Sequence, residues 1–149
     1  MRQSRDAGQS LVEVLIAIVL TGTLAIAGMI TLRASIAASA IDRDHANAHA
    51  WLQTATDVLY GAPREDCGTE ALTVPDAVAD AYDAIIKATP NPRNWDPSLI
   101  QVVRPVTFWN GKSAFGNICY GAGINLQLIT VQVKAPDGRI VESVQIVKG

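Results

Sequence analysis

The 149-residue sequence predicts an α+β fold: a long N-terminal helix whose second half packs on a small antiparallel sheet, with one short extra helix. Residues 9–62 contain no proline, and helical spacing continues well beyond the apolar first half. Gly61 and Pro63 then mark the end of this helix. From residue 98 onward, three segments rich in β-branched residues alternate as strands do.

The first half of the predicted helix is apolar enough to cross a membrane. Leu11 to Leu32 is a 22-residue window whose only charge is Glu13, and about 20 apolar residues span a bilayer core. Arg2 and Arg5 precede this window and favour a cytoplasmic N-terminus with the rest of the chain exported. A secretory signal has a shorter apolar core of about 7–15 residues, so we expect a retained membrane helix.

The second half of the helix has an amphipathic pattern. Its apolar positions recur at helical spacing among charged and amide residues: Ile41, Ala48, Leu52, Ala55 and Leu59. A helix of about 50 residues would be about 75 Å long at 1.5 Å per residue. We expect its second half to offer an apolar stripe to a globular domain.

The pattern of residues 62–149 predicts a globular α+β domain, the head. Residues 62–73 are a polar connection, and Pro75 opens a short helix, because proline suits a first helical turn. The strand segments are residues 98–109, 124–135 and 139–147, with turn signals at Asn110-Gly111 and at residues 136–138. Pro105 lacks an amide hydrogen, so we expect an edge or a bulge in the first strand.

The stretch AGQSLVEVLIAIVL, residues 7–20, resembles the N-terminus of type IV prepilins and the related pseudopilins of secretion systems. The resemblance implies a leader, residues 1–8, that a prepilin peptidase removes after Gly8. It also implies methylation of the new terminal amine of Gln9, and it makes Glu13 the fifth residue of the mature chain. The mature chain would then comprise the long helix, residues 9–61, and the head.

The same resemblance implies where the protein works and with which partners. It would cross the prokaryotic cytoplasmic membrane once, with its N-terminus in the cytoplasm, before entering a cell-surface or periplasmic filament. Its partners would be other pilin or pseudopilin subunits and the inner-membrane assembly machinery. The family's commonest first mature residue is Phe, so Gln9 favours a minor pilin. The alternatives are a pseudopilin of a type II-like secretion system and a membrane-tethered binding domain that does not polymerise.

Glu13 is costly in a membrane unless it has a partner. A carboxylate at the centre of a membrane helix costs about 2.5–3.5 kcal/mol on insertion scales, although a position near the helix end costs less. After cleavage, the amine of a neighbouring subunit is the natural partner, because opposite charges attract more strongly in a medium of low dielectric constant. We expect this pair to set the register of one subunit against the next.

Small residues form one face of the apolar helix. Ala17, Thr21, Ala25 and Gly28 fall at i, i+4, i+8 and i+11, and Gly22 matches a helix glycine of the pilin family. Small faces let helix backbones approach closely in an apolar medium, although such residues are common in any membrane helix. We expect this face to pack against neighbouring helices.

Cys67 and Cys119 are the two cysteines. In an exported domain a disulfide between them would persist, although two free thiols remain open. A bridge would close a loop of about 50 residues, worth about 4 kcal/mol in the chain-entropy model.

Other residues give little support for a catalytic, metal or nucleic-acid site. His45 and His49 lie four apart with Asp42 nearby, but a solvated helix surface explains them better than a metal site does. No nucleophile motif is present, so we expect no enzyme and no cofactor. A net charge of −2 without a basic cluster argues against nucleic-acid binding. The aromatic residues of the head are assigned to the core in preference to a recognition patch: Trp95, Phe108, Trp109 and Tyr120.

Overall fold

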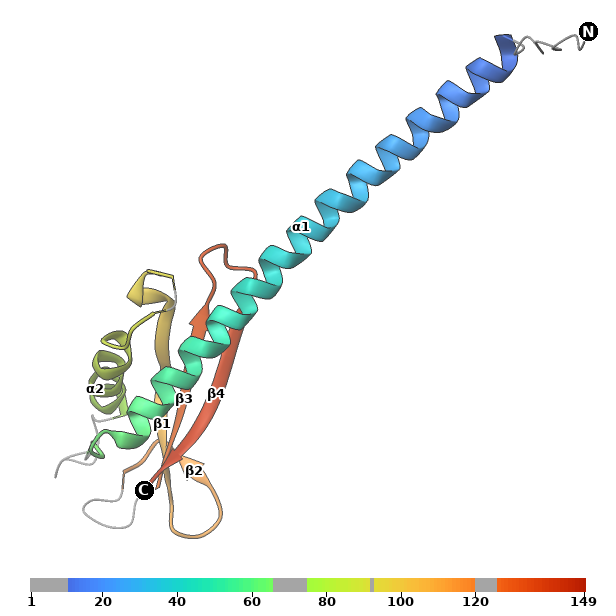
Figure 1. Ribbon diagram of the computed structural model, residues 1–149. Coiled ribbons are helices and arrows are strands. Elements are labelled where there is room, and N and C mark those ends of the chain that lie inside the picture. The colour runs from blue at the N-terminus through green and yellow to red at the C-terminus, as the bar shows by residue number, and fades with distance from the viewer. Residues whose placement is uncertain (1–10, 66–74, 92, 120–125) are drawn as a thin grey trace, which may run out of the picture. The chain divides into compact units, whose positions relative to one another are not determined.

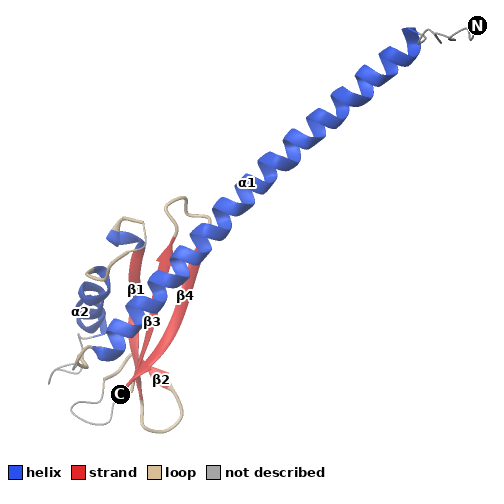
Figure 2. Cartoon of the chain, in the orientation of Figure 1, coloured by secondary structure: helices blue, strands red, loops and turns tan. Residues whose placement is uncertain are grey.

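The computed structural model describes residues 11–65, 75–91, 93–119 and 126–149. The elements are α1 (Leu11–Gly61), α2 (Pro75–Lys87), the 3-10 helix η1 (Pro97–Leu99), β1 (Ile100–Trp109), β2 (Phe115–Gly116), β3 (Gln127–Lys134) and β4 (Val141–Lys148). Figure 2 shows the two α-helices and the strands. The α+β class is therefore confirmed.

The chain divides into two compact units, residues 1–42 and residues 43–149. In the first unit, every described residue is exposed and belongs to α1. The second unit, called the head below, contains residues 43–61 of α1 together with the sheet and α2.

The head contains a four-stranded antiparallel sheet in the order β2-β1-β3-β4 (Figure 1). β3 and β4 pair without a break over eight residues, from Gln127↔Lys148 to Lys134↔Val141. Gly138 has a φ of +71° in the turn between them, a conformation that suits glycine. The two-residue strand β2 was not predicted, since Phe115–Gly116 is too short to show an alternating pattern.

Pro105 coincides with an irregularity in β1, as the sequence predicts. The pairing of β1 with β3 changes register between Val103 and Thr107, and the Arg104–Pro105 peptide bond is cis. The bulge accommodates a residue that cannot donate a ladder hydrogen bond. Beyond the bulge, Trp109 N donates to Leu126 O at 2.8 Å, so pairing with the chain around β3 continues to the end of β1.

One hydrophobic core joins the second half of α1, α2 and the inner face of the sheet. α1 contributes Ala48, Trp51, Leu52, Ala55 and Leu59, which confirms four of the five positions in the predicted stripe and adds Trp51. Burying a large side chain is worth about 1.5–3 kcal/mol, so these contacts anchor the helix on the sheet.

Buried polar side chains also connect the elements that surround this core. Lys148 of β4 is 6% exposed, and its Nζ donates to Leu59 O at 2.6 Å and to Ala62 O at 2.7 Å. These carbonyls lie at the C-terminal end of α1, where the helix leaves carbonyl groups without internal partners. Tyr82 Oη donates to Gln127 Oε1 at 2.5 Å and joins α2 to β3 in the same way.

Asp83 joins α2 to the sheet. Its Oδ1 accepts a hydrogen bond from Val102 N at 2.6 Å, and its Oδ2 accepts one from Lys87 Nζ at 2.6 Å. Asp83 is 9% exposed, so these bonds to a backbone amide and an ammonium group satisfy a nearly buried carboxylate.

Candidate functional site

Glu13 lies in the first turn of α1, where the partial positive charge of a helix N-terminus favours a carboxylate. It is exposed, and within the described part of the chain no hydrogen bond or ion pair engages it. The structure therefore leaves this carboxylate available to a group outside the described residues. Gly8 and Gln9 themselves lie outside the described residues, so cleavage and methylation stay predictions.

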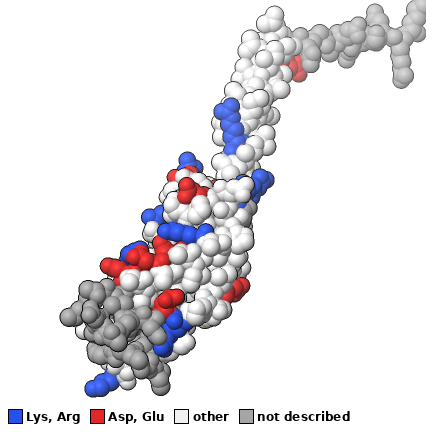
Figure 3. Space-filling model, turned by 90° about the vertical axis from the view of Figure 1, so that its left-hand side faces the viewer, with Lys and Arg blue, Asp and Glu red and all other residues white. Residues whose placement is uncertain are grey.

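The helix around Glu13 presents an apolar surface that nothing in the described chain covers. Its most apolar 18-residue window has a mean hydropathy of 2.3, and none of that window is buried. By length and composition this helix is able to cross a membrane. Figure 3 shows the largely uncharged surface of this segment.

The hydroxyl groups of this segment are satisfied within the helix. Thr21 Oγ1 donates to Ala17 O at 2.7 Å, and Thr23, Thr31 and Ser35 likewise donate to carbonyls three or four residues earlier. In an apolar medium an unpaired hydroxyl is costly, and bonding back to the helix removes that cost. The segment therefore suits an environment without water.

The small-residue face forms a shallow groove on the helix. Ala17, Thr21, Gly22 and Ala25 line it, with Val14 and Ile18 along its sides. The structure thus brings together four of the five predicted packing residues, while Gly28 is not part of the lining.

Within the described part of the chain, nothing packs against the helix glycines Gly22 and Gly28. A Cβ added at Gly22 or Gly28 would meet nothing within 4 Å apart from the helix's own backbone and sequence neighbours. Glycine costs about 1 kcal/mol relative to alanine inside a helix. A close approach by another helix would offset this cost, because a face without Cβ atoms lets two backbones come together.

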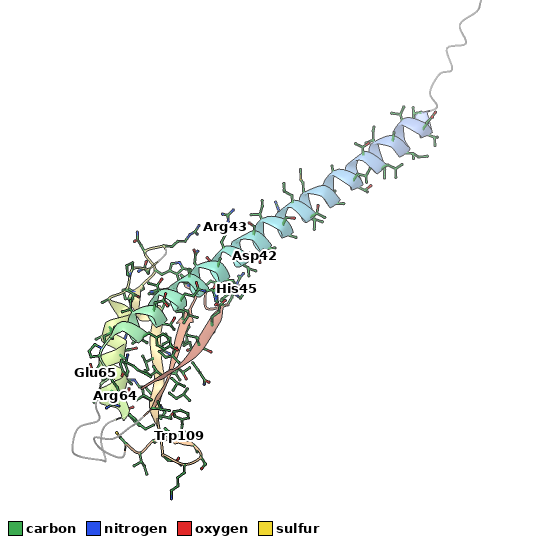
Figure 4. The ribbon with its side chains drawn as sticks, turned by 60° about the horizontal axis from the view of Figure 1, so that its bottom comes forward. Asp42, Arg43, His45, Arg64, Glu65 and Trp109 are labelled. Atoms are coloured by element: carbon green, nitrogen blue, oxygen red, sulfur yellow. The ribbon has the colours of Figure 1, made fainter. Side chains whose placement is uncertain are left out.

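His45 and His49 meet a carboxylate from the sheet rather than a metal-binding set of side chains. His45 Nδ1 lies 2.8 Å from Glu142 Oε1, and His49 Nδ1 lies 3.8 Å from Glu142 Oε2. Figure 4 labels His45 on α1, beside Asp42, the acid that the sequence places near the two histidines. Among the described residues, no group of three or more His, Cys, Asp or Glu side chains has metal-binding geometry.

The aromatic residues of the head divide between core and surface. Trp95 and Phe108 are buried, as expected, and Trp95 packs edge-on against Trp51 at 6.2 Å between ring centroids. Trp109 is only half-buried and packs edge-on against Phe115 at the end of β1 (Figure 4). Tyr120 lies outside the described residues.

Cys119 is 4% exposed and belongs to the core of the head. Cys67 lies outside the described residues, so the Cys67–Cys119 bridge stays a prediction.

The comparison with protein families agrees with the geometry of the N-terminal segment. Residues 3–29 match the family model described as the prokaryotic N-terminal methylation motif. This segment is a type IV prepilin-like motif. It contains Glu13 and the small-residue groove, and it points to a structural, pilin-like protein that associates with a membrane and with other subunits. No curated protein and no solved structure matches the chain.

Proposed function

We propose that this protein is a structural subunit of a type IV pilus-like filament, most specifically a minor pilin. It is cleaved after Gly8, methylated on the amine of Gln9, and held in the cytoplasmic membrane by α1 with its N-terminus in the cytoplasm until assembly. The observation that carries the proposal is the methylation motif at residues 3–29, whose described part, residues 11–29, belongs to α1 and is exposed throughout.

The geometry of α1 supports a helix that moves from the membrane into the apolar interior of a filament. The hydroxyls of Thr21, Thr23 and Thr31 in its apolar segment are already satisfied, so both a bilayer and a bundle of helices can surround that segment. The groove at Ala17 and Gly22 offers a neighbouring helix a close approach. Glu13, which has no partner among the described residues, is left to pair with the terminal amine of the next subunit.

The N-terminus of the protein isolated from its own host tests the processing step. Mass spectrometry is expected to find a mature chain beginning at methylated Gln9. A chain that retains residues 1–8, or one that begins at Ile41, would contradict the proposal.

Substitution of Glu13 tests the assembly step. Glu13→Gln keeps the size of the side chain but removes the charge that attracts an amine. Hydrogen bonds to charged groups are worth about 1.5–3 kcal/mol, so incorporation into sheared filaments is expected to fall at least about tenfold. Asp57→Asn is the matched control, because it makes the same chemical change at an exposed position of the same helix within the head. Equal incorporation of both variants would contradict the role of Glu13.

The place and amount of the processed protein distinguish the related functions. A minor pilin is expected in extracellular filaments at low abundance relative to a companion pilin. A pseudopilin would remain in a periplasmic filament, and a tethered binding domain would remain in the membrane whatever residue occupies position 13.

A further inference from the structure

The two outer edges of the sheet differ, and the edge on the β1 side is closed. Asp83 Oδ1 accepts the hydrogen bond of Val102 N at 2.6 Å, which occupies an outward-facing amide. Pro105 has no amide hydrogen to offer, and the register breaks on either side of it. β2 covers the remaining end of the strand at Phe108 and Trp109. A further strand therefore has no continuous edge to pair with on this side.

Within the described part of the chain, no strand pairs with the outer edge of β4, which is called the open edge below. β4 pairs with β3 over eight consecutive residues without a bulge, and its sequence VESVQIVK contains no proline. Inward-pointing charges often protect sheet edges. The two inward-pointing charged residues of β4 already have partners. Glu142 contacts the two histidines of α1, and Lys148 donates to carbonyls at the end of that helix. Ser143 to Val147, between these two residues, carries no charge.

The hydrogen bond of Val102 shows which groups of β4 face outward. In an antiparallel sheet, two directly opposite residues point their N–H and C=O groups either toward each other or away from each other. The backbone N–H of Val102 points away from its partner Val131, because it donates to Asp83. The backbone groups of Val131 therefore point toward β4, where they pair with those of Val144. The residues that alternate with Val144 therefore direct their N–H and C=O groups outward: Val141, Ser143, Gln145 and Val147.

A groove runs beside this open edge within the head. It has a volume of about 330 Å³ and lies between α1 and β4. Its lining comprises His49, Leu52, Gln53 and Thr56 from α1, and Glu142, Ser143 and Val144 from β4. A strand added beside β4 would direct every second side chain toward this groove, where the half-buried Val144 would gain cover.

We propose that the β4 edge binds an extended, uncharged segment of a different protein subunit, which adds a fifth strand to the sheet and fills the groove with apolar side chains. This proposal rests on the filament function proposed above. The uncharged stretch Ser143–Val147 and the apolar side chains of Leu52 and Val144 suit such a segment. The outward backbone groups supply its hydrogen bonds, as in other cases of strand addition.

Among the described strands, the edge strands of a second copy do not supply a repeating contact with β4. Pairing β4 with β4 uses the same edge on both copies and closes after two, whereas a filament needs a contact that repeats from copy to copy. The repeating alternative, β4 of one copy against β1 of the next, meets the edge closed by Asp83 and Pro105. Since neither pairing repeats along a filament, we assign the partner strand to a subunit of another sequence.

Amide hydrogen exchange tests the proposal directly. The full chain is measured after dispersal in detergent, in sheared filaments and in membranes of its own host, with resolution at single residues. We expect the amides of Ser143, Gln145 and Val147 to exchange at least about tenfold more slowly in a native fraction than in detergent. The amides of Val144 and Ile146 face β3 and provide the internal control, because they should be protected in every sample.

Two variants of Gln145 distinguish the contribution of its backbone amide from that of its side chain. Gln145→Pro removes an outward amide hydrogen at an edge position, where proline is tolerated. Gln145→Thr changes the side chain and keeps that hydrogen. We expect Gln145→Pro to lower the amount of chain retained in the native fraction about five- to tenfold, and Gln145→Thr to leave it unchanged.

Each remaining outcome contradicts one specific claim. Equal exchange of the outward amides in detergent and in both native fractions overturns strand addition. Protection in detergent that rises with the concentration of the chain overturns the choice of a different subunit in favour of a second copy. A chain without methylated Gln9 contradicts the filament function, and the exchange in membranes then still decides the β4 proposal.

Discussion

Replacing Lys148 with methionine is expected to destabilise the head strongly. Lys148→Met keeps an unbranched side chain of similar length but removes the ammonium group that donates to Leu59 O and Ala62 O. A buried carbonyl left unpaired costs about 1–3 kcal/mol. A cation at a helix C-terminus contributes a further 0.3–1 kcal/mol or so, and the last turn of α1 has no basic residue of its own. The expected loss is therefore about 1.5–4 kcal/mol.

Urea unfolding of the full chain in mild detergent measures this loss. The fluorescence of the buried Trp51 and Trp95 reports the head, and with a slope of about 2 kcal/mol per molar urea the midpoint should fall by roughly 1–2 M. Lys134→Met is the control, because Lys134 is an exposed lysine at the end of the neighbouring strand. Losses that agree within about 0.5 kcal/mol for the two variants would refute the capping role of Lys148.

Three further predictions concern polar groups of the head. Asp83→Ala leaves an amide of β1 without its acceptor and should cost about 2–3 kcal/mol in the same urea assay, with faster exchange of the Val102 amide. Tyr82→Phe removes the hydroxyl that joins α2 to β3 and should cost about 1–2 kcal/mol in thermal unfolding. The backbone amide of Ser98 lowers the pKa of Asp96 below its ordinary value of 3.8, so the ionised carboxylate stabilises the fold above that value. The stability difference between wild type and Asp96→Ala should therefore shrink as the pH falls through the lowered pKa; a constant difference would contradict this account.

Much of the fold was predictable because its signals are local. The absence of proline from residues 9–62 and the change to β-branched alternation after residue 98 predicted α1 and the antiparallel sheet, and both are confirmed. The bulge at Pro105 was also predictable, since a residue without an amide hydrogen interrupts any ladder. The motif at residues 3–29 needs only spacing and charge along one segment, and the family comparison confirms it.

Contacts between distant segments were not predictable from the sequence. Trp51 was missed as a core residue, although it lies beside Leu52 and three residues after Ala48 on the same buried face. Nothing local distinguishes Lys148 from other lysines, and its role depends on a helix end almost 90 residues earlier in the chain. Likewise, nothing near His45 in the sequence reveals Glu142 of β4, which the structure places beside it.

The sequence by itself determined that the N-terminal segment is prepilin-like, because a motif of spaced residues, an apolar run and a lone carboxylate are properties of consecutive residues. It also determined the class of the head, because period-two and helical patterns record which side chains each element buries. Only the tertiary structure decided which sheet edge is open. An edge is closed by groups from elsewhere in the chain, such as Asp83 of α2, which binds the amide of Val102 in β1. The sequence of β1 does not reveal this contact. The sequence of β4 likewise does not reveal that its outer edge has no such contact among the described residues.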